Sequence, residues 1–132
     1  AALVAAGLEV DEALIQVGAF TEEAAVEPAR RLLTMADRPT AVFASNDLSA
    51  KQVIEQAVAL GLRVPDDLSV IGYDDIELAA LMNLTTVRQP LEGSGRRGAD
   101  LVLEAIAANA RPQLAEELQV ELVVRSTTGP RR

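Results

Sequence analysis

Short apolar segments alternate along the chain with longer segments of helical periodicity. β-branched and apolar residues gather at 14–18, 40–44, 68–72, 85–88 and 118–125, and between these runs apolar residues recur at three- and four-residue steps. This alternation is typical of βαβ units. The pattern therefore predicts an α/β fold, with an open parallel sheet of five strands and helices on both faces.

Four helices are expected, one between each pair of consecutive strands. They cover about 21–35, 48–60, 76–82 and 91–109. Thr21 is a good N-cap for the first, and Gly61 is a good stop for the second. Pro28 lies inside the first helix, so we expect a kink or a restart near Glu27.

The opening segment 1–8 is apolar, but it has no basic flank and is too short for an export signal or a membrane span. It is typical of the last turns of a helix that ends at Gly7. We expect a cytoplasmic chain without a membrane partner, and a tail at 129–132 that is loosely held.

The composition excludes several classes of function. A chain of 132 residues suits one domain, and its formal net charge of −8 opposes binding to nucleic acid. There is no cysteine and no histidine, which excludes disulfides, thiolate nucleophiles and the usual general base. We expect neither an enzyme nor a bound cofactor or metal ion.

Polar and aromatic groups follow the ends of the predicted strands. These are Phe20, the Ser45-Asn46-Asp47 run, the Tyr73-Asp74-Asp75 run and Gln89. In open parallel sheets, ligands bind beyond the carboxyl ends of the strands. Carboxylate and amide groups pair with hydroxyls, and an aromatic face covers a sugar or a base. Phe20, Asn46, Asp74 and Gln89 are therefore the candidate ligand-binding residues.

Each of these residues also has a purely structural interpretation. Asn46 and Asp47 could cap the helix that follows them, and Asp74 and Asp75 could form a turn before Ile76. Phe20 could simply anchor its loop to the core. Tyr73 is expected to pack, and Phe43 is expected in the core because it lies inside a strand.

Two further motifs could indicate a dinucleotide-binding site or a magnesium site, but other features of the sequence oppose both. The glycines at 93, 95 and 98 match a dinucleotide-binding pattern, but Pro90 starts a helix there and places them within its first turns. Asp47, Asp74 and Asp75 could hold magnesium, yet no partnered nucleophile accompanies them. An enzyme with a nucleotide cofactor, based on the glycine pattern, is a third alternative.

Several spaced segments resemble the lactose- and galactose-repressor (LacI/GalR) family. They are PTAVFASND at 39–47, GLRVPDDLSVIGYDDI at 61–76, LTTVRQP at 84–90 and ELVVRST at 121–127. Together they cover most of the chain in order. The sequence is therefore identified as a member of this family, and departs from its pattern at Pro28, Gly93 and Gly98.

The resemblance implies a regulator with an amino-terminal helix-turn-helix and a two-lobed effector domain like a type I periplasmic sugar-binding protein. Residues 1–132 would be mainly the second lobe, lacking an effector-gripping arginine, and the 91–109 helix would pack on the absent first lobe. By motif, Asn46 would supply an amide contact, Asp74 the effector carboxylate, Phe20 an aromatic wall and Gln89 a contact at the crossover.

The resemblance also implies partners. Family members form homodimers through surfaces that correspond here to Lys51, Glu55, Leu81 and Met82. Operator DNA would be read only through the absent helix-turn-helix.

The alternative function is a periplasmic sugar-binding receptor of a transport system. Both sugar-like and purine effectors are possible for the regulator. Without the first lobe, we expect Leu101, Val102 and Ile106 to pack elsewhere or against another copy.

Overall fold

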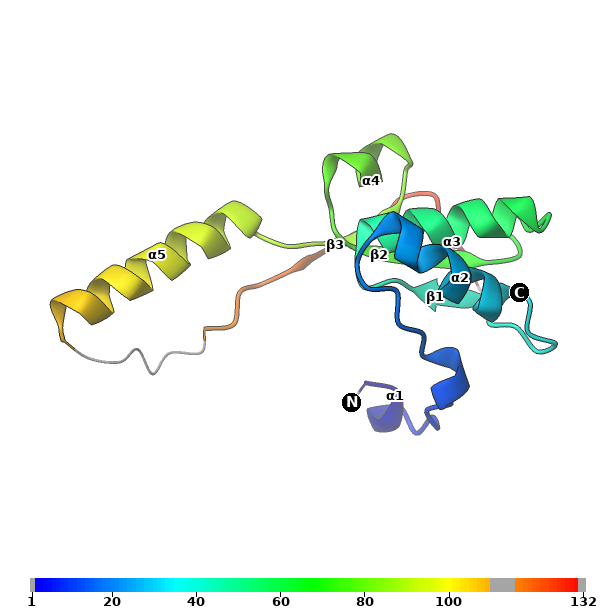
Figure 1. Ribbon diagram of the computed structural model, residues 1–132, viewed down its shortest axis with the longest axis horizontal. Helices are drawn as coiled ribbons and strands as arrows, with labels where there is room; N and C mark the ends of the chain where they lie inside the picture. The colour runs from blue at the N-terminus through cyan, green and yellow to red at the C-terminus, as the bar shows by residue number, and fades with distance from the viewer. Residues whose placement is uncertain (1, 110–115, 131–132) are drawn as a thin grey trace.

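A computed structural model describes residues 2–109 and 116–130 (Figure 1). The elements in chain order are α1 (Ala2–Ala5), a 3-10 turn η1 (Glu12–Leu14), α2 (Glu22–Leu33), β1 (Ala41–Phe43), α3 (Asp47–Ala59), β2 (Ser69–Asp74), α4 (Glu77–Leu81), β3 (Thr85–Arg88), α5 (Leu91–Ala107) and β4 (Glu121–Val123). The four expected helices are confirmed within two residues at their ends. Gly7 and Gly61 both have positive φ just after helices, as their expected role as stops requires.

The sheet has the order β1-β2-β3-β4. β1 and β2 are parallel, as are β2 and β3, with Gly72 opposite Thr86. β4 is antiparallel to β3, with Leu122 opposite Val87. The α/β class with an open and mostly parallel sheet is confirmed, but the last strand is shorter than 118–125 and runs the other way. Its direction follows from the path of the chain, because β3 leads out to α5 and β4 leads back (Figure 1).

The core lies on one face of the sheet. Val42 and Val70 point from β1 and β2 into a cluster with Ala50 and Val53 of α3 and Ala79 of α4. α2 packs on α3, so these helices share one layer. Within the part of the chain that the structure describes, helices cover this face alone, whereas cover on both faces was expected.

Phe43 lies on the opposite face and is 62% exposed, so its prediction as a core residue was wrong. Side chains alternate along a strand, and its neighbour Val42 takes the core position. The Phe43 ring meets Tyr73 edge-on, with centroids 6.4 Å apart. This aromatic pair is therefore at the surface of the described chain.

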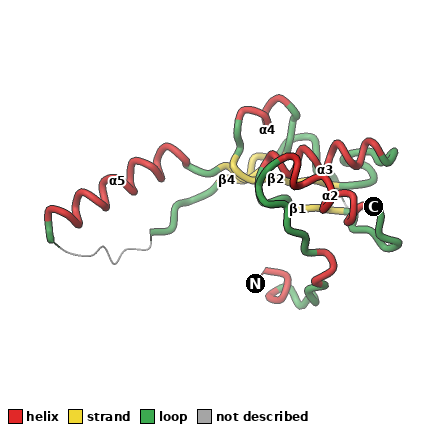
Figure 2. The backbone as a smooth tube through the Cα atoms, viewed as in Figure 1, coloured by secondary structure: helices red, strands yellow, loops and turns green. Residues whose placement is uncertain are grey.

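The first expected strand, at 14–18, is a second correction. Ile15 is extended, but the segment pairs with none of the strands in the described chain, and Val17 is 84% exposed. A recess separates it from β1, lined by Gln16, Gly18 and Phe43 among others. Gln16 and Gly18 are half-buried, with Gly18 beside Ala25 and Ser49, whereas Ile15 and Val17 are exposed. Ladder hydrogen bonds add little net stability where one face of a segment buries no apolar side chain. Figure 2 shows the stretch between η1 and α2 as loop.

α2 begins as predicted, since the Thr21 hydroxyl accepts a hydrogen bond from Ala24 N. Of the kink or restart expected near Glu27, the restart was wrong, because the helix runs unbroken across Pro28, whereas the kink stays a prediction. Proline removes one backbone donor, and the buried stripe of Ala25, Ala29, Leu32 and Leu33 holds the helix on the core in spite of that loss.

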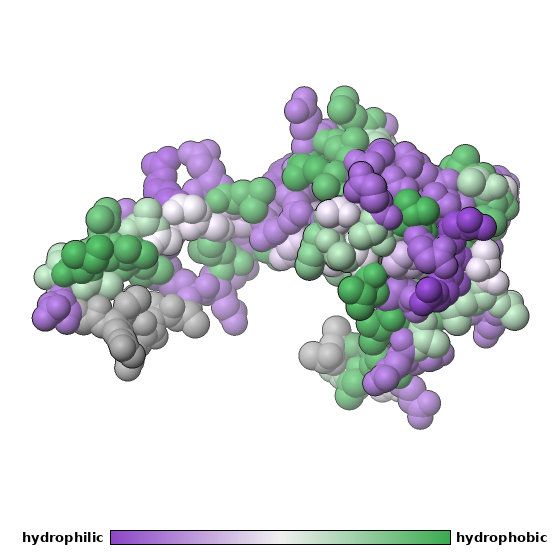
Figure 3. Space-filling view, in the orientation of Figure 1, coloured by the Kyte–Doolittle hydropathy of each residue, from purple (hydrophilic) through white to green (hydrophobic). Residues whose placement is uncertain are grey.

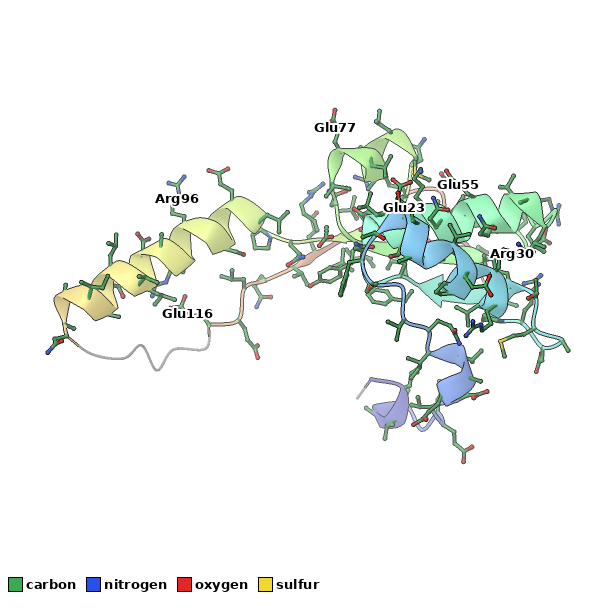
Figure 4. The ribbon with its side chains drawn as sticks, viewed as in Figure 1. Glu23, Arg30, Glu55, Glu77, Arg96 and Glu116 are labelled. Atoms are coloured by element: carbon green, nitrogen blue, oxygen red, sulfur yellow. The ribbon has the colours of Figure 1, made fainter. Side chains whose placement is uncertain are left out.

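α5 projects away from the sheet and has no buried residue. Arg97 on this helix forms an ion pair with Glu116 on the segment that returns to the sheet, with 2.6 Å between Nη2 and Oε1. Figure 4 labels Glu116. Val102, Leu103 and Ile106 are all more than half exposed, and hydrophobic atoms gather near the far end of the arm in Figure 3. Among the residues that the structure describes, nothing covers the apolar face of this arm.

Candidate functional site

The carboxyl ends of β1, β2 and β3 lie at the same edge of the sheet because the three strands are parallel. Asn46 follows β1, Asp74 is the last residue of β2, and Gln89 directly follows β3. Phe20 lies in the loop before α2 and reaches this edge through a contact with Asn46. The four predicted residues thus form two contacting pairs on neighbouring strand ends.

Asp74 and Gln89 form the first pair. The Gln89 amide donates a hydrogen bond of 2.5 Å from Nε2 to Asp74 Oδ1. Asp74 has φ of 112°, a conformation that residues with a side chain rarely adopt. A carboxylate has further acceptor sites on both oxygens, so this contact leaves Asp74 able to accept hydroxyl or amine protons from a bound molecule.

Asn46 and Phe20 form the second pair. Asn46 Oδ1 accepts from Ser49 N at 2.9 Å and caps α3, and its Nδ2 donates to the Phe20 carbonyl at 3.0 Å. The capping interpretation of Asn46 is therefore confirmed, and one amide hydrogen remains for another partner. Phe20 is 67% exposed, so anchoring to the core, the alternative considered for it, was wrong.

Asp47 lies behind this edge and is fully buried. Its Oδ1 accepts from the Thr86 hydroxyl at 2.6 Å, and its Oδ2 accepts from Ile76 N at 2.9 Å. The carboxylate fits because residue 72 is glycine; a Cβ there would overlap Asp47 Oδ1. Asp47 therefore connects the start of α3 with the loop after β2 and does not face the open edge.

Asp75 points the other way and meets two arginines. Arg125 Nη2 donates to its Oδ1 and Arg88 Nε to its Oδ2, both at 2.7 Å. Burial alone would raise the pKa of this carboxyl, but the hydrogen bonds and charges of Arg125 and Arg88 outweigh it and hold the pKa below its ordinary value. Sequence reasoning missed this cluster, although all three residues stand in the segments that carry the family resemblance.

Neither alternative chemistry gains support at this edge. Within residues 2–109 and 116–130, no three acidic side chains converge as a metal site would require. Gly93, Gly95 and Gly98 lie inside α5, as predicted, and do not form a phosphate-binding turn between strand and helix. Over the same described residues, none of the helices is long and apolar enough to cross a membrane.

The residues expected at a dimer interface lie on α3 and at the end of α4. Lys51 contacts both Glu22 and Glu55, and Figure 4 shows Glu55 at the outer side of α3. Leu81 is 75% exposed, whereas Met82 packs against the core. Lys51, Glu55 and Leu81 are thus at the surface of this chain.

Residues 1–128 match the model of the periplasmic binding protein-like domain. The chain belongs to this family. The resemblance to LacI-type regulators that the sequence indicated is confirmed by relatives that carry that name.

One relative is the HTH-type transcriptional repressor PurR of Photobacterium profundum, 39% identical over 128 residues, which are 96% of this chain and 38% of that repressor. Among solved structures, the complex of the transcriptional regulator CelR with cellobiose is 38% identical over 96% of this chain and 39% of the other, with a TM-score of 0.87. A LacI family regulator from Lactobacillus casei with bound sucrose is 28% identical over 96% of this chain and 47% of the other, with a TM-score of 0.78. The chain thus spans less than half the length of each.

Proposed function

We propose that this chain is mainly the C-terminal lobe of the effector-binding domain of a LacI-type transcription regulator. The observation that carries the proposal is the pair of Asp74 and Gln89 at the strand-end edge, beside Asn46 and the exposed ring of Phe20. The lobe binds a small molecule and does no chemistry on it. The regulator works in the cytoplasm and reads operator DNA through a helix-turn-helix outside this chain.

The chemistry of the edge favours a sugar-like or purine-like effector. Asp74 accepts two donor protons, the amides of Asn46 and Gln89 donate, and Phe20 covers an apolar ring face. The cellobiose and sucrose in the two solved regulators are ligands of this class. Relatives named as transcription regulators favour this function over a periplasmic receptor of a transport system.

In this proposal the effector lies between two lobes, and the arm formed by α5 packs on the first lobe. The apolar residues Val102, Leu103 and Ile106 would be covered there, which accounts for their exposure in this chain. Effector binding would then change how the lobes close and so the spacing of the two DNA-reading heads.

The regulator is proposed to act as a homodimer. Leu81 supplies an exposed apolar contact, and Lys51 and Glu55 supply charged contacts on α3. Met82, which packs against the core, would join the interface at its margin. We also propose that the site binds its effector without a metal ion or a cofactor.

A ligand panel on the full-length regulator tests this function. Thermal unfolding is followed with cellobiose, sucrose, D-glucose, D-ribose and guanine, each added well above its expected dissociation constant. Binding to the native state alone raises the midpoint temperature, by an amount that grows with concentration. A shift with one sugar or with guanine supports the proposal, and no shift with any of the five contradicts the proposed effector class.

A further inference from the structure

The loop that carries Asp74 has an unusual backbone. Asp74 has φ of 112° and Asp75 has φ of 57°, so two consecutive residues with side chains lie in the left-handed region. Such conformations persist only where the surroundings hold them, and they concentrate at ligand sites. The contacts that hold this loop therefore decide where the Asp74 carboxylate points.

One side of the loop is held through Asp75. Its side chain is 7% exposed, and each carboxylate oxygen accepts from a different arginine, Arg125 and Arg88. Arg125 is fixed in turn, because its Nη1 donates to the Leu84 carbonyl at 2.7 Å and its own backbone N–H donates to Thr85 Oγ1 at 2.9 Å. Asp75 is thus anchored to β3 and to the segment after β4.

The other side of the loop is held through Ile76. Its backbone N–H donates to Asp47 Oδ2, while Thr86 donates to Asp47 Oδ1. Asp47 is fully buried, and its Oδ1 occupies the space that a Cβ at residue 72 would need. The loop is therefore held at Asp75 by the two arginines and at Ile76 by Asp47. Asp74 is the acid of this loop that faces Gln89 and the open edge.

We propose that Asp75, Arg125 and Asp47 are positioning residues of the effector site. They touch no effector, because the Asp47 and Asp75 carboxylates are buried with both oxygens bonded within the protein, and Arg125 is held by Asp75 and the Leu84 carbonyl. They act by fixing the left-handed backbone that aims Asp74. This rests on the proposed function in one respect, namely that Asp74 contacts the effector. Carboxylate recognition depends on direction, so loosening the loop weakens binding without removing any contacting group.

The test uses the full-length regulator with Asp75→Asn, Arg125→Gln and Arg125→Lys. The matched control is Asp67→Asn, since Asp67 also pairs with an arginine, Arg63, at 2.8 Å, but just before β2 and at its opposite end. Dissociation constants are measured for cellobiose, sucrose, D-glucose, D-ribose and guanine. Hydrogen exchange of the 73–77 segment is measured without any of these compounds.

Asp75→Asn and Arg125→Gln should weaken binding of whichever compound binds the wild type by about tenfold or more and speed exchange at 73–77. Arg125→Lys, which keeps the charge, should fall between Arg125→Gln and the wild type. Asp67→Asn should leave both measurements unchanged. Arg125→Lys also serves if a more drastic variant does not fold.

Two results would overturn the inference. One is unchanged exchange at 73–77 in the Asp75 and Arg125 variants, and the other is an equal loss of affinity in Asp67→Asn, which would indicate general destabilisation. If none of the five compounds binds the wild type, the proposed effector class fails. In that case the exchange measurement still decides whether these residues hold the loop.

Discussion

The amide of Gln89 donates a hydrogen bond of 2.5 Å to Asp74 Oδ1, across the ends of β3 and β2. Gln89 is also where the chain leaves the sheet for α5, and Asp74 is where it leaves for α4. One contact therefore links the main candidate acid of the site to the segment that leads out to the arm. The predictions below concern the packing that supports this edge and the chemistry that it offers.

Gly72→Ala should destabilise the fold by about 1–3 kcal/mol, because a Cβ would overlap Asp47 Oδ1 and meet Leu84 Cδ2 at 2.9 Å. Gly95→Ala is the matched control, since nothing lies within 4 Å of its Cβ position in α5. Alanine there should be neutral or stabilise by up to about 1 kcal/mol. Urea unfolding measures both, and equal midpoints for the two variants would contradict the close packing at Gly72.

Thr86→Val keeps the shape of the side chain but removes the hydroxyl that donates to buried Asp47 at 2.6 Å. A buried acceptor without its partner costs about 1–3 kcal/mol, so unfolding should occur at lower urea. Thr34→Val removes an exposed hydroxyl bonded to the Arg30 carbonyl and should change stability by less than about 0.5 kcal/mol. A Thr86→Val protein as stable as the wild type would show that Asp47 does not depend on this bond.

Acid should weaken the fold partly through Asp75. The folded-state pKa of this carboxyl lies below its ordinary 3.8, because Arg125 and Arg88 favour the charged form against the cost of burial. The stabilisation is present above the unfolded-state pKa and is lost as pH falls through the lower folded-state pKa. The free energy of unfolding should thus fall less steeply below pH 4 in Asp75→Asn than in the wild type. Parallel curves would contradict the two ion pairs.

The apolar face of α5 should cause association when the 132-residue chain is studied alone. Val102, Leu103 and Ile106 are exposed and have no partner on the sheet. Val102→Lys with Ile106→Lys should shift sedimentation toward a single copy, because the charges prevent apolar contact. A wild-type chain that sediments as a single copy at high concentration would contradict this.

Periodicity located most elements correctly. β3 matches the expected 85–88, and α3 and α4 differ from expectation only at their ends. The failures concern segments whose structure depends on what packs against them. Residues 14–18 have the composition of a strand, but the apolar side chains of Ile15 and Val17 are exposed, and Phe43 lies on the face that the described helices leave uncovered.

Local chemistry indicated the candidate site because the residues after parallel strands always meet at one edge. The contacts behind that edge could not be predicted in the same way. Asp75 pairs with Arg125 across 50 positions of sequence, and Asp47 bonds Thr86 across 39. Which of two adjacent acids faces the edge depends on backbone dihedrals at Asp74 and Asp75, and no spacing rule supplies these.

The central claim is that Asp74 contacts the effector, and a titration of Asp74→Asn in the full-length regulator tests it most directly. Asparagine keeps the size of the side chain and removes its charge, so affinity for the compound from the panel that binds the wild type should fall by about tenfold or more. Asp37→Asn, an exposed acid in the turn after α2, should leave affinity unchanged. Wild-type affinity in Asp74→Asn would contradict the account.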